Sequence, residues 1–293
     1  MRLRHLILPL VLLASACSAE VPVRKGEGPV LWKLSDADTT IYLFGTIHAL
    51  PKGLKWRTAT IDQAVAASQE LWLETTLDKV GTETLQAMLD MGTDEAVPSI
   101  TLRVAPAKRE ALEAMIKRSG YPRPLFDQLE TWAAGFVLTA VSMRDLGLDG
   151  LSGVEEQLSV DFTKAGKPIG GLETSKQQLG YFDDLPEDDQ RRFLDDTLED
   201  PKKSKVEFDA MLSAWAQGDE QAIINTFDDE MRKTKRLRQV LLVDRNRRWA
   251  GWVRERMKRP GTVMVAVGAG HLSGAGSVVD LLQSVGEKVE RVE

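Results

Sequence analysis

The sequence predicts an α/β protein, with a mixed β-sheet formed by N- and C-terminal segments and a large helical insertion between them. Strand-like runs with apolar residues occur near both ends of the chain, at residues 39–48 and 262–271. Helix-spaced segments follow each run, and residues 77 to 259 are largely helical in pattern. Strands that alternate with helices at this spacing are typical of parallel β-α-β units.

The N-terminal region contains the first of these units. Residues 29–34 and 39–48 are strand-like and flank the turn sequence SDAD, which predicts a hairpin. Residues 58–69 then carry an apolar stripe at helical spacing, and residues 70–75 are strand-like again. We therefore expect a β-α-β crossover of about the minimum length.

The middle of the chain supplies the insertion, at about residues 77–259. Four segments have helical spacing and end near Gly or Pro: 83–91, 105–120, 125–147 and 154–166. One short apolar piece, residues 167–174, is consistent with a further strand that returns to the sheet at Glu173. No internal repeat or low-complexity tract is visible.

The C-terminal region closes the sheet. A strand at 262–271 precedes a helix at 276–286, and residues 288–292 form the last predicted strand. We therefore expect residues 18–293 to form a single α/β domain.

The first residues have the pattern of an export signal. A basic start is followed by an apolar stretch from Leu6 to Leu13 and then by small residues, and this stretch is too short to span a bilayer. Cys17 is the only cysteine and directly follows LASA, so residues 1–17 are similar to a bacterial lipoprotein signal with a lipid anchor on Cys17. Simple cleavage after Ala16 or Ala19 is the alternative. Both predict an exported protein without an internal disulfide, either soluble in the periplasm or anchored to the outer membrane.

The composition indicates a globular protein and gives little support to a nucleic-acid partner. Hydrophobic residues make up 43% of the chain, charged residues 28%, and the net charge is −6. The basic stretch from Arg232 to Arg259 fits a solvated helix face better than a nucleic-acid or membrane surface, because acidic segments flank it. GAGHLSGAG lacks the lysine of a phosphate-binding loop.

Two histidines occupy the same local setting. His48 and His271 each follow an apolar run and a glycine in the pattern G-x-x-H, and the third histidine, His5, lies in the predicted leader. In a parallel sheet, ligands gather at the carboxyl ends of the strands. His48, Glu74 and His271 each end a predicted strand, so we expect them to converge, and Glu173 is a candidate to join them. Two imidazoles and a carboxylate suffice to hold a divalent metal, although a histidine at a strand end is often structural.

Arg245 is a further candidate. On a helix over 236–257, Arg245 lies in the middle of an apolar stripe that contains Leu241 and Trp249, whereas Arg247 points the opposite way. An inward arginine requires a carboxylate, an anionic ligand or carbonyl oxygens. The alternative is a snorkelling side chain or a structural ion pair.

These motifs together resemble the TraB/GumN family, whose relatives include the Tiki proteins and the pheromone shutdown proteins. The resemblance covers most of the mature chain through LWKL, LFGTIHAL, LWLET, GKPIGGLET, LLVDRNRRWA and VAVGAGHLSG. It implies a metal-dependent hydrolase in which His48, His271 and Glu74 hold the metal, and Glu74 and Arg245 act in catalysis. The Tiki relatives imply a peptidase that uses manganese or cobalt, and zinc is an alternative. Relatives often have Asp where Glu155 stands, and neither Glu155 nor Gln178 receives a role from the resemblance.

The sequence thus predicts hydrolysis of a peptide or related acyl bond in the cell envelope. Glu74 would act as metal ligand or general base, and Arg245 would hold a substrate carboxylate or the developing oxyanion. The main alternative is a non-catalytic protein of the same fold that binds and sequesters a peptide. A phosphate-ester enzyme would need more carboxylates at the strand ends. The sequence predicts neither the substrate nor the oligomeric state.

Overall fold

The computed structural model describes residues 28–76, 82–148, 153–231 and 235–293. The predicted leader and Cys17 lie outside the described residues. Within the described part of the chain, no helix is both long and apolar enough to cross a bilayer.

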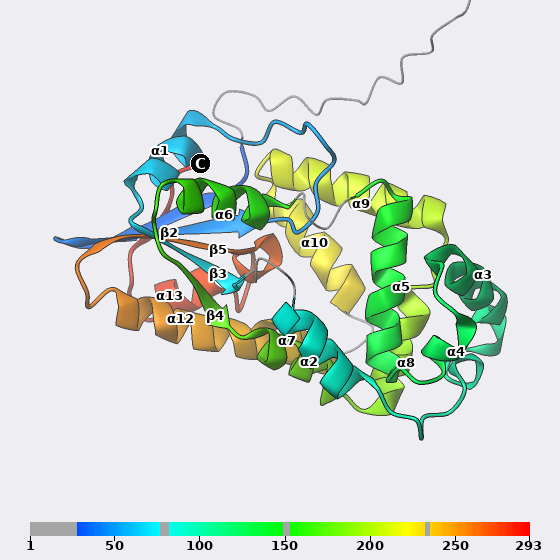
Figure 1. The fold of residues 1–293 in the computed structure, drawn as a ribbon. Coiled ribbons are helices and arrows are strands. Elements are labelled where there is room, and N and C mark those ends of the chain that lie inside the picture. The colour runs from blue at the N-terminus through cyan, green and yellow to red at the C-terminus, as the bar shows by residue number, and fades with distance from the viewer. Residues whose placement is uncertain (1–27, 77–81, 149–152, 232–234) are drawn as a thin grey trace, which may run out of the picture.

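A six-stranded mixed sheet organises the fold (Figure 1). Its strand order is β4-β3-β5-β2-β1-β6. The strands are β1 (Leu31–Ser35), β2 (Thr39–Thr46), β3 (Glu70–Thr75), β4 (Ile169–Glu173), β5 (Gly261–Gly268) and β6 (Val289–Arg291). Each neighbouring pair from β4 to β2 is parallel, and β1 is antiparallel to both β2 and β6. The predicted α/β class and the pairing of N- and C-terminal strands are confirmed, and β4 is the short strand from the middle of the chain.

The predicted β-α-β unit exists, but its strands are not neighbours. Helix α1 (Ala59–Ala67) connects β2 to β3, and β5 lies between them, paired with both. Every residue from Val263 to Val267 on β5 is buried. A strand that is apolar on both faces is stabilised at the centre of a sheet with helices on each side, which is where β5 lies.

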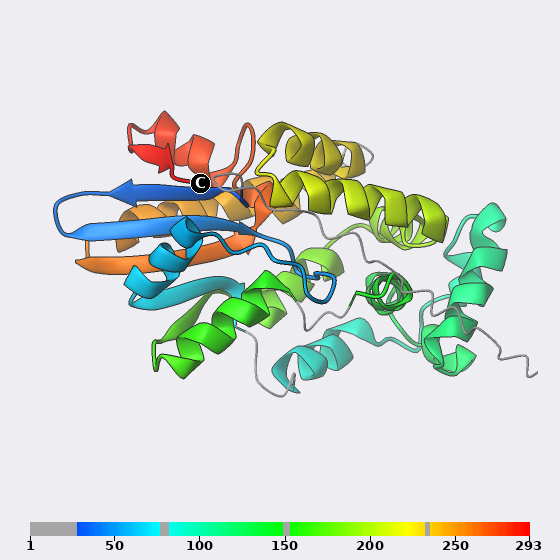
Figure 2. The same ribbon diagram turned by 90° about the horizontal axis from the view of Figure 1, so that it is seen from above.

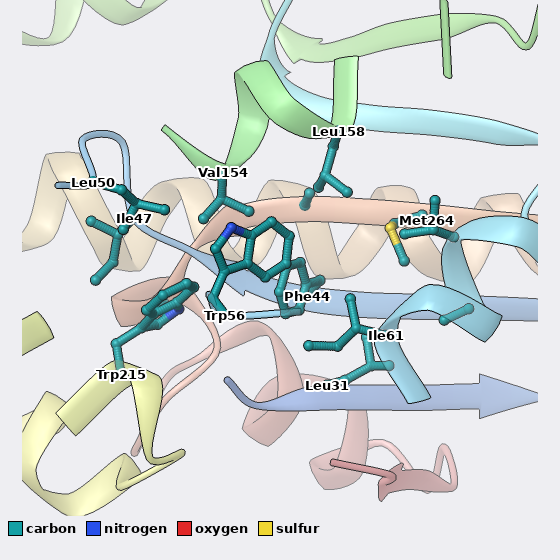
Figure 3. Packing of buried hydrophobic residues seen from close by; sticks show 14 of the residues in the cluster. Leu31, Phe44, Ile47, Leu50, Trp56, Ile61, Val154, Leu158, Trp215 and Met264 are labelled. Carbon is teal, nitrogen blue, oxygen red and sulfur yellow. The ribbon is translucent and has the colours of Figure 1, made fainter. Parts of the chain in front are cut away.

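Helices cover both faces of the sheet. One face packs on α1, α6 (Val154–Lys164) and α9 (Pro201–Ala216), and Figure 3 shows Trp56 of this core between Phe44 and Trp215. The opposite face packs on α12 (Asp244–Arg256) and α13 (Val278–Ser284). On β2, Phe44 enters the first core and Leu43 the second, as expected from the alternation of side chains along a strand.

Six of the described helices form a lobe beside the sheet with its own apolar core (Figure 2). Its elements are α2 (Thr82–Gly92), α3 (Arg109–Ser119), α4 (Arg123–Phe126), α5 (Thr131–Asp145), α7 (Ser175–Asp183) and α8 (Glu187–Asp196). Helix α10 (Glu220–Met231) packs mainly on α9.

The helix that carries Arg245 is not uniform. The sequence predicts one α-helix over 236–257, whereas the structure has α11 (Lys235–Arg238), a π-helical turn at Gln239–Val243 and then α12. The N–H of Asp244 donates to the carbonyl of Gln239, five residues back. Such π turns are rare and frequently lie at functional sites. The prediction of a continuous α-helix is therefore wrong over these five residues.

Candidate functional site

Three predicted residues surround Gly268 at the carboxyl end of the parallel strands. His48 lies in the loop after β2, Glu74 near the end of β3, and His271 in a 3-10 turn (Ala269–His271) after β5. A Cβ atom on Gly268 would lie 3.2 Å from Glu74 Oε1, 3.7 Å from His271 Cδ2 and 3.8 Å from His48 Nε2. The three side chains thus converge on one point, and glycine leaves that point open.

His271 is held by α12. Its Nδ1 lies 2.6 Å from Asn246 Oδ1, while the Asn246 amide nitrogen donates to the carbonyl of Gly276. This arrangement assigns the proton to Nδ1 and leaves the lone pair on Nε2. The imidazole packs on Trp249, with ring centroids 4.4 Å apart. Burial, which outweighs the attraction of Glu74, lowers the pKa of His271 to about 3, so the ring is neutral at pH 7.

His48 is held by α6, on the opposite face of the sheet. Its Nδ1 lies 2.8 Å from Glu155 Oε1, which also accepts from the Thr46 hydroxyl. Gly153 permits this contact, because a Cβ there would overlap the carbonyl oxygen of His48. The protein atoms around the ring displace part of its water, which acts to lower the pKa of His48, but the charge and hydrogen bond of Glu155 outweigh this and raise the pKa to about 9. The side chain is 72% exposed, so solvent screens part of this attraction.

Glu74 is a buried carboxylate with several donors. Oε1 accepts from the N–H of Gly268 at 2.8 Å and lies 3.8 Å from His271 Nε2. Oε2 accepts from Arg245 at 2.6 Å and from Gln178 at 3.2 Å. Burial alone would raise the pKa of Glu74, but the nearby histidines, Arg245 and the Gly268 N–H lower it to about 2. Glu74 is therefore ionised at neutral pH.

Arg245 lies at the centre of this network. As the apolar stripe predicted, it is buried, at 7% exposure, whereas the side chains of Arg247 and Arg248 are 64% and 50% exposed. Its Nε donates to Glu173 and its Nη2 donates to Glu74, and Nη2 also forms an ion pair with Glu173 at 2.9 Å. Its Nη1 donates to the carbonyl of Leu241 in the π turn and lies 3.2 Å from His271 Nε2. Every nitrogen of this guanidinium has a protein partner.

Glu173 joins the site, as its place at the end of β4 suggested. Besides Arg245, its carboxylate accepts from Tyr181 at 2.9 Å, from Arg248 at 3.3 Å and from Gln178 at 3.5 Å. Gln178 therefore connects Glu74 with Glu173. Sequence reasoning gave it no role, and the structure assigns it this bridge.

Four residues around the site were missed: Glu155, Asn246, Tyr181 and Arg248. Glu155 had a signal in the segment SGVEEQL, but the sequence contains nothing that pairs it with His48, 107 positions away. Asn246 adjoins Arg245 and points inward because of the helical period. A search for polar neighbours on the inward face would have found it.

The imidazole nitrogens and the Glu74 carboxylate are atoms of the kind that bind divalent metals, and the histidine rings are oriented for it. Each histidine has its Nδ1 held by a side-chain oxygen, which leaves Nε2 as the coordinating nitrogen, a pattern usual for metal-binding histidines. Glu74 is ionised and lies within reach of His271 Nε2. Among the described residues, no three histidine, cysteine or acidic side chains are already arranged as a complete metal site. Arg245 contacts His271 Nε2, the nitrogen that would face an ion, and it bonds Glu74 through Oε2, whereas Oε1 is the oxygen beside Gly268 and His271.

The fold and this cluster define a class: α/β proteins whose parallel strands carry a histidine–carboxylate–arginine site at their carboxyl ends. The chain belongs to the TraB/PrgY/gumN family, whose sequence profile matches residues 30–291. It is similar to the uncharacterized protein YbaP of Escherichia coli (strain K12) and of Shigella flexneri. Each is 29% identical over 192 residues, which cover 64% of this chain and 69% of the relative. No solved structure matches the chain.

Proposed function

We propose that this protein is a metal-dependent hydrolase that cleaves peptide or related acyl bonds in the cell envelope. The observation that carries the proposal is the convergence of His48, Glu74 and His271 on Gly268, with both histidines oriented through Nδ1. Manganese or cobalt is the proposed ion, with zinc as the alternative. When bound, such an ion polarises a carbonyl and makes water more acidic.

The chain's own residues divide the remaining work. Asn246 and Glu155 fix the histidine rings, and the N–H of Gly268 fixes one oxygen of Glu74. The low pKa of Glu74 makes it a weak base, which favours the role of ligand over that of general base. Because all nitrogens of Arg245 are engaged, we assign it to positioning Glu74 and Glu173.

The experiment that tests the proposal combines metal analysis with turnover. The purified protein should contain or bind one divalent ion per chain and cleave members of a peptide library, and chelation should stop cleavage. Glu74→Gln should lower metal affinity first if Glu74 is a ligand. Full cleavage after chelation would overturn the proposal. Stoichiometric peptide binding without cleavage, with or without metal, would favour a peptide-sequestering protein.

Export is a separate part of the proposal, based on the basic–apolar–small pattern that ends at Cys17. Mass spectrometry of protein from the native membrane fraction should find a chain that begins at an acylated Cys17, or one cleaved nearby. An intact Met1 with unmodified Cys17 would exclude both forms.

A further inference from the structure

A second arginine lies beside the buried cluster at the protein surface. The side chain of Arg248 is 50% exposed, one turn along α12 from the buried Arg245. Its Nη2 donates to the Tyr181 hydroxyl at 2.7 Å and to Glu173 at 3.3 Å. Among the described residues its Nε and Nη1 have no protein partner. Arg248 thus reaches both the site and the solvent.

Tyr181 holds this arginine in place. The Arg248 guanidinium carbon lies 5.3 Å from the centre of the tyrosine ring, within cation–π range, in addition to the bond with the hydroxyl. The same hydroxyl donates to Glu173, so Tyr181 is itself anchored. An arginine fixed in this way loses less conformational entropy when a ligand binds than a free surface arginine does.

The buried Arg245 is not free to bind the carboxylate of a ligand. Sequence reasoning considered Arg245 as a receptor for a substrate carboxylate, but its nitrogens are occupied by Glu74, Glu173, Leu241 and His271. A ligand carboxylate there would have to displace a buried carboxylate that is already paired, which is costly. Arg248 requires no displacement, because three N–H groups, one on Nε and two on Nη1, remain free within the described structure.

We propose that Arg248, positioned by Tyr181, is a specificity residue that binds a carboxylate of the substrate. The inference rests on the proposed peptide hydrolysis and names its substrate class: peptides with a carboxylate near the bond that is cleaved. Arg248 reaches Glu74 through Glu173 and Arg245, a path of three hydrogen bonds. An extended peptide rises about 3.3–3.6 Å per residue, so the carboxylate lies within about three residues of that bond.

A peptide carries a carboxylate either at its C-terminus or on an Asp or Glu side chain, and one peptide pool distinguishes these two sources. The probe is a randomised N-acetylated hexapeptide pool, synthesised as the C-terminal acid and as the C-terminal amide. Peptides retained by the full mature protein in the presence of a chelator are quantified by mass spectrometry, so binding is measured without metal-dependent turnover. Preference for the acid pool identifies a C-terminal carboxylate. Enrichment of Asp and Glu over Asn and Gln within the amide pool identifies a side-chain carboxylate.

The variants make the assignment specific to Arg248. Wild-type protein should prefer the carboxylate form by about five- to tenfold in at least one comparison, as expected for one charge-assisted hydrogen-bonded pair. Arg248→Ala should abolish the preference, and Tyr181→Phe should weaken it although the charge remains. Arg247→Ala is the matched control, because Arg247 is on the same helix, is 64% exposed and pairs with Asp244 instead; it should behave as wild type. Thermal unfolding of each variant checks that the fold is retained.

The outcomes separate the two proposals. If the wild type binds both members of each pair equally, or binds neither, the proposed role of Arg248 is wrong. It is also wrong if the preference for carboxylate peptides survives in Arg248→Ala. The same samples are then supplied with manganese, cobalt or zinc. Retention of carboxylate peptides without cleavage would leave the carboxylate site standing and would refute hydrolysis.

Discussion

Arg245 Nη2 lies 2.6 Å from Glu74 Oε2, and about nine-tenths of each side chain is buried. The pair joins α12 to the end of β3, and the same Nη2 lies 2.9 Å from Glu173 on β4. One guanidinium thus pairs with two carboxylates from adjacent strands. A buried pair of this kind is weak evidence for net stabilisation, but removing one partner leaves charges buried without compensation.

The first prediction concerns this pair. Arg245→Ala should lower the free energy of unfolding by about 3–5 kcal/mol, because Glu74 and Glu173 lose their shared partner. Arg245→Lys keeps the charge but cannot contact both carboxylates, His271 and Leu241 together, so it should lose activity or metal affinity with a smaller loss of stability. Urea denaturation and metal titration measure the two effects. Arg247→Lys serves as control, and an Arg245→Lys protein that matches it would refute the role of Arg245.

The second prediction concerns the two histidines. Because residues that act as one unit give non-additive losses, His48→Ala, His271→Ala and the double variant should lose metal binding and activity to similar extents. Metal content by mass spectrometry and turnover by peptide cleavage provide the measurements. If each single variant retains metal and the losses add, the histidines belong to separate sites.

Much of the sheet could be predicted from the sequence, because strand periodicity and flanking turns are local signals. The inward position of Arg245 also followed from helical periodicity alone. The place of β5 between β2 and β3 could not be predicted, since order in a parallel sheet depends on which strands are buried on both faces. The π turn before Arg245 leaves no clear local pattern.

The candidate site could likewise be predicted only in part. His48, Glu74 and His271 could be proposed because each ends a strand-like run. Their oxygen partners could not, because the pairing of Glu155 with His48 depends on how α6 docks over the sheet. Tyr181 and Arg248 meet across 67 positions, which is likewise a result of helix packing.

The third prediction concerns the pH dependence of metal binding. Glu155 raises the pKa of His48, so near pH 7 an ion that binds His48 must displace a proton. Manganese affinity should therefore rise with pH, approaching tenfold per pH unit, until His48 is deprotonated. In Glu155→Gln the amide oxygen can still accept from Nδ1, but the charge is gone, so the rise should end at a lower pH. Calorimetry in buffers of different ionisation enthalpy counts the protons released. Affinity that is independent of pH from 6 to 9 would exclude His48 as a ligand.

The last prediction concerns stability in acid. The folded-state pKa of His271 is about 3, below the ordinary value of 6.5, so the unfolded chain binds the proton more readily. The stability that His271 contributes is thus complete above pH 6.5 and is lost as the pH falls from 6.5 toward 3, by up to about 1.4 kcal/mol per pH unit. Glu74, whose folded-state pKa of about 2 lies below 4.5, acts in the same direction only below about pH 4.5. His48 has the opposite effect, because folding raises its pKa from 6.5 to about 9. The stability that it contributes is present below pH 6.5 and is lost as the pH rises toward 9. Urea denaturation of the metal-free protein from pH 4.5 to 9 should therefore show a free energy of unfolding that decreases toward acid pH and toward alkaline pH. His271→Gln should reduce the acid decrease, and His48→Gln should reduce the alkaline decrease. If the free energy of unfolding of His271→Gln decreases toward acid pH as steeply as that of the wild type, the buried imidazole is not the group that titrates.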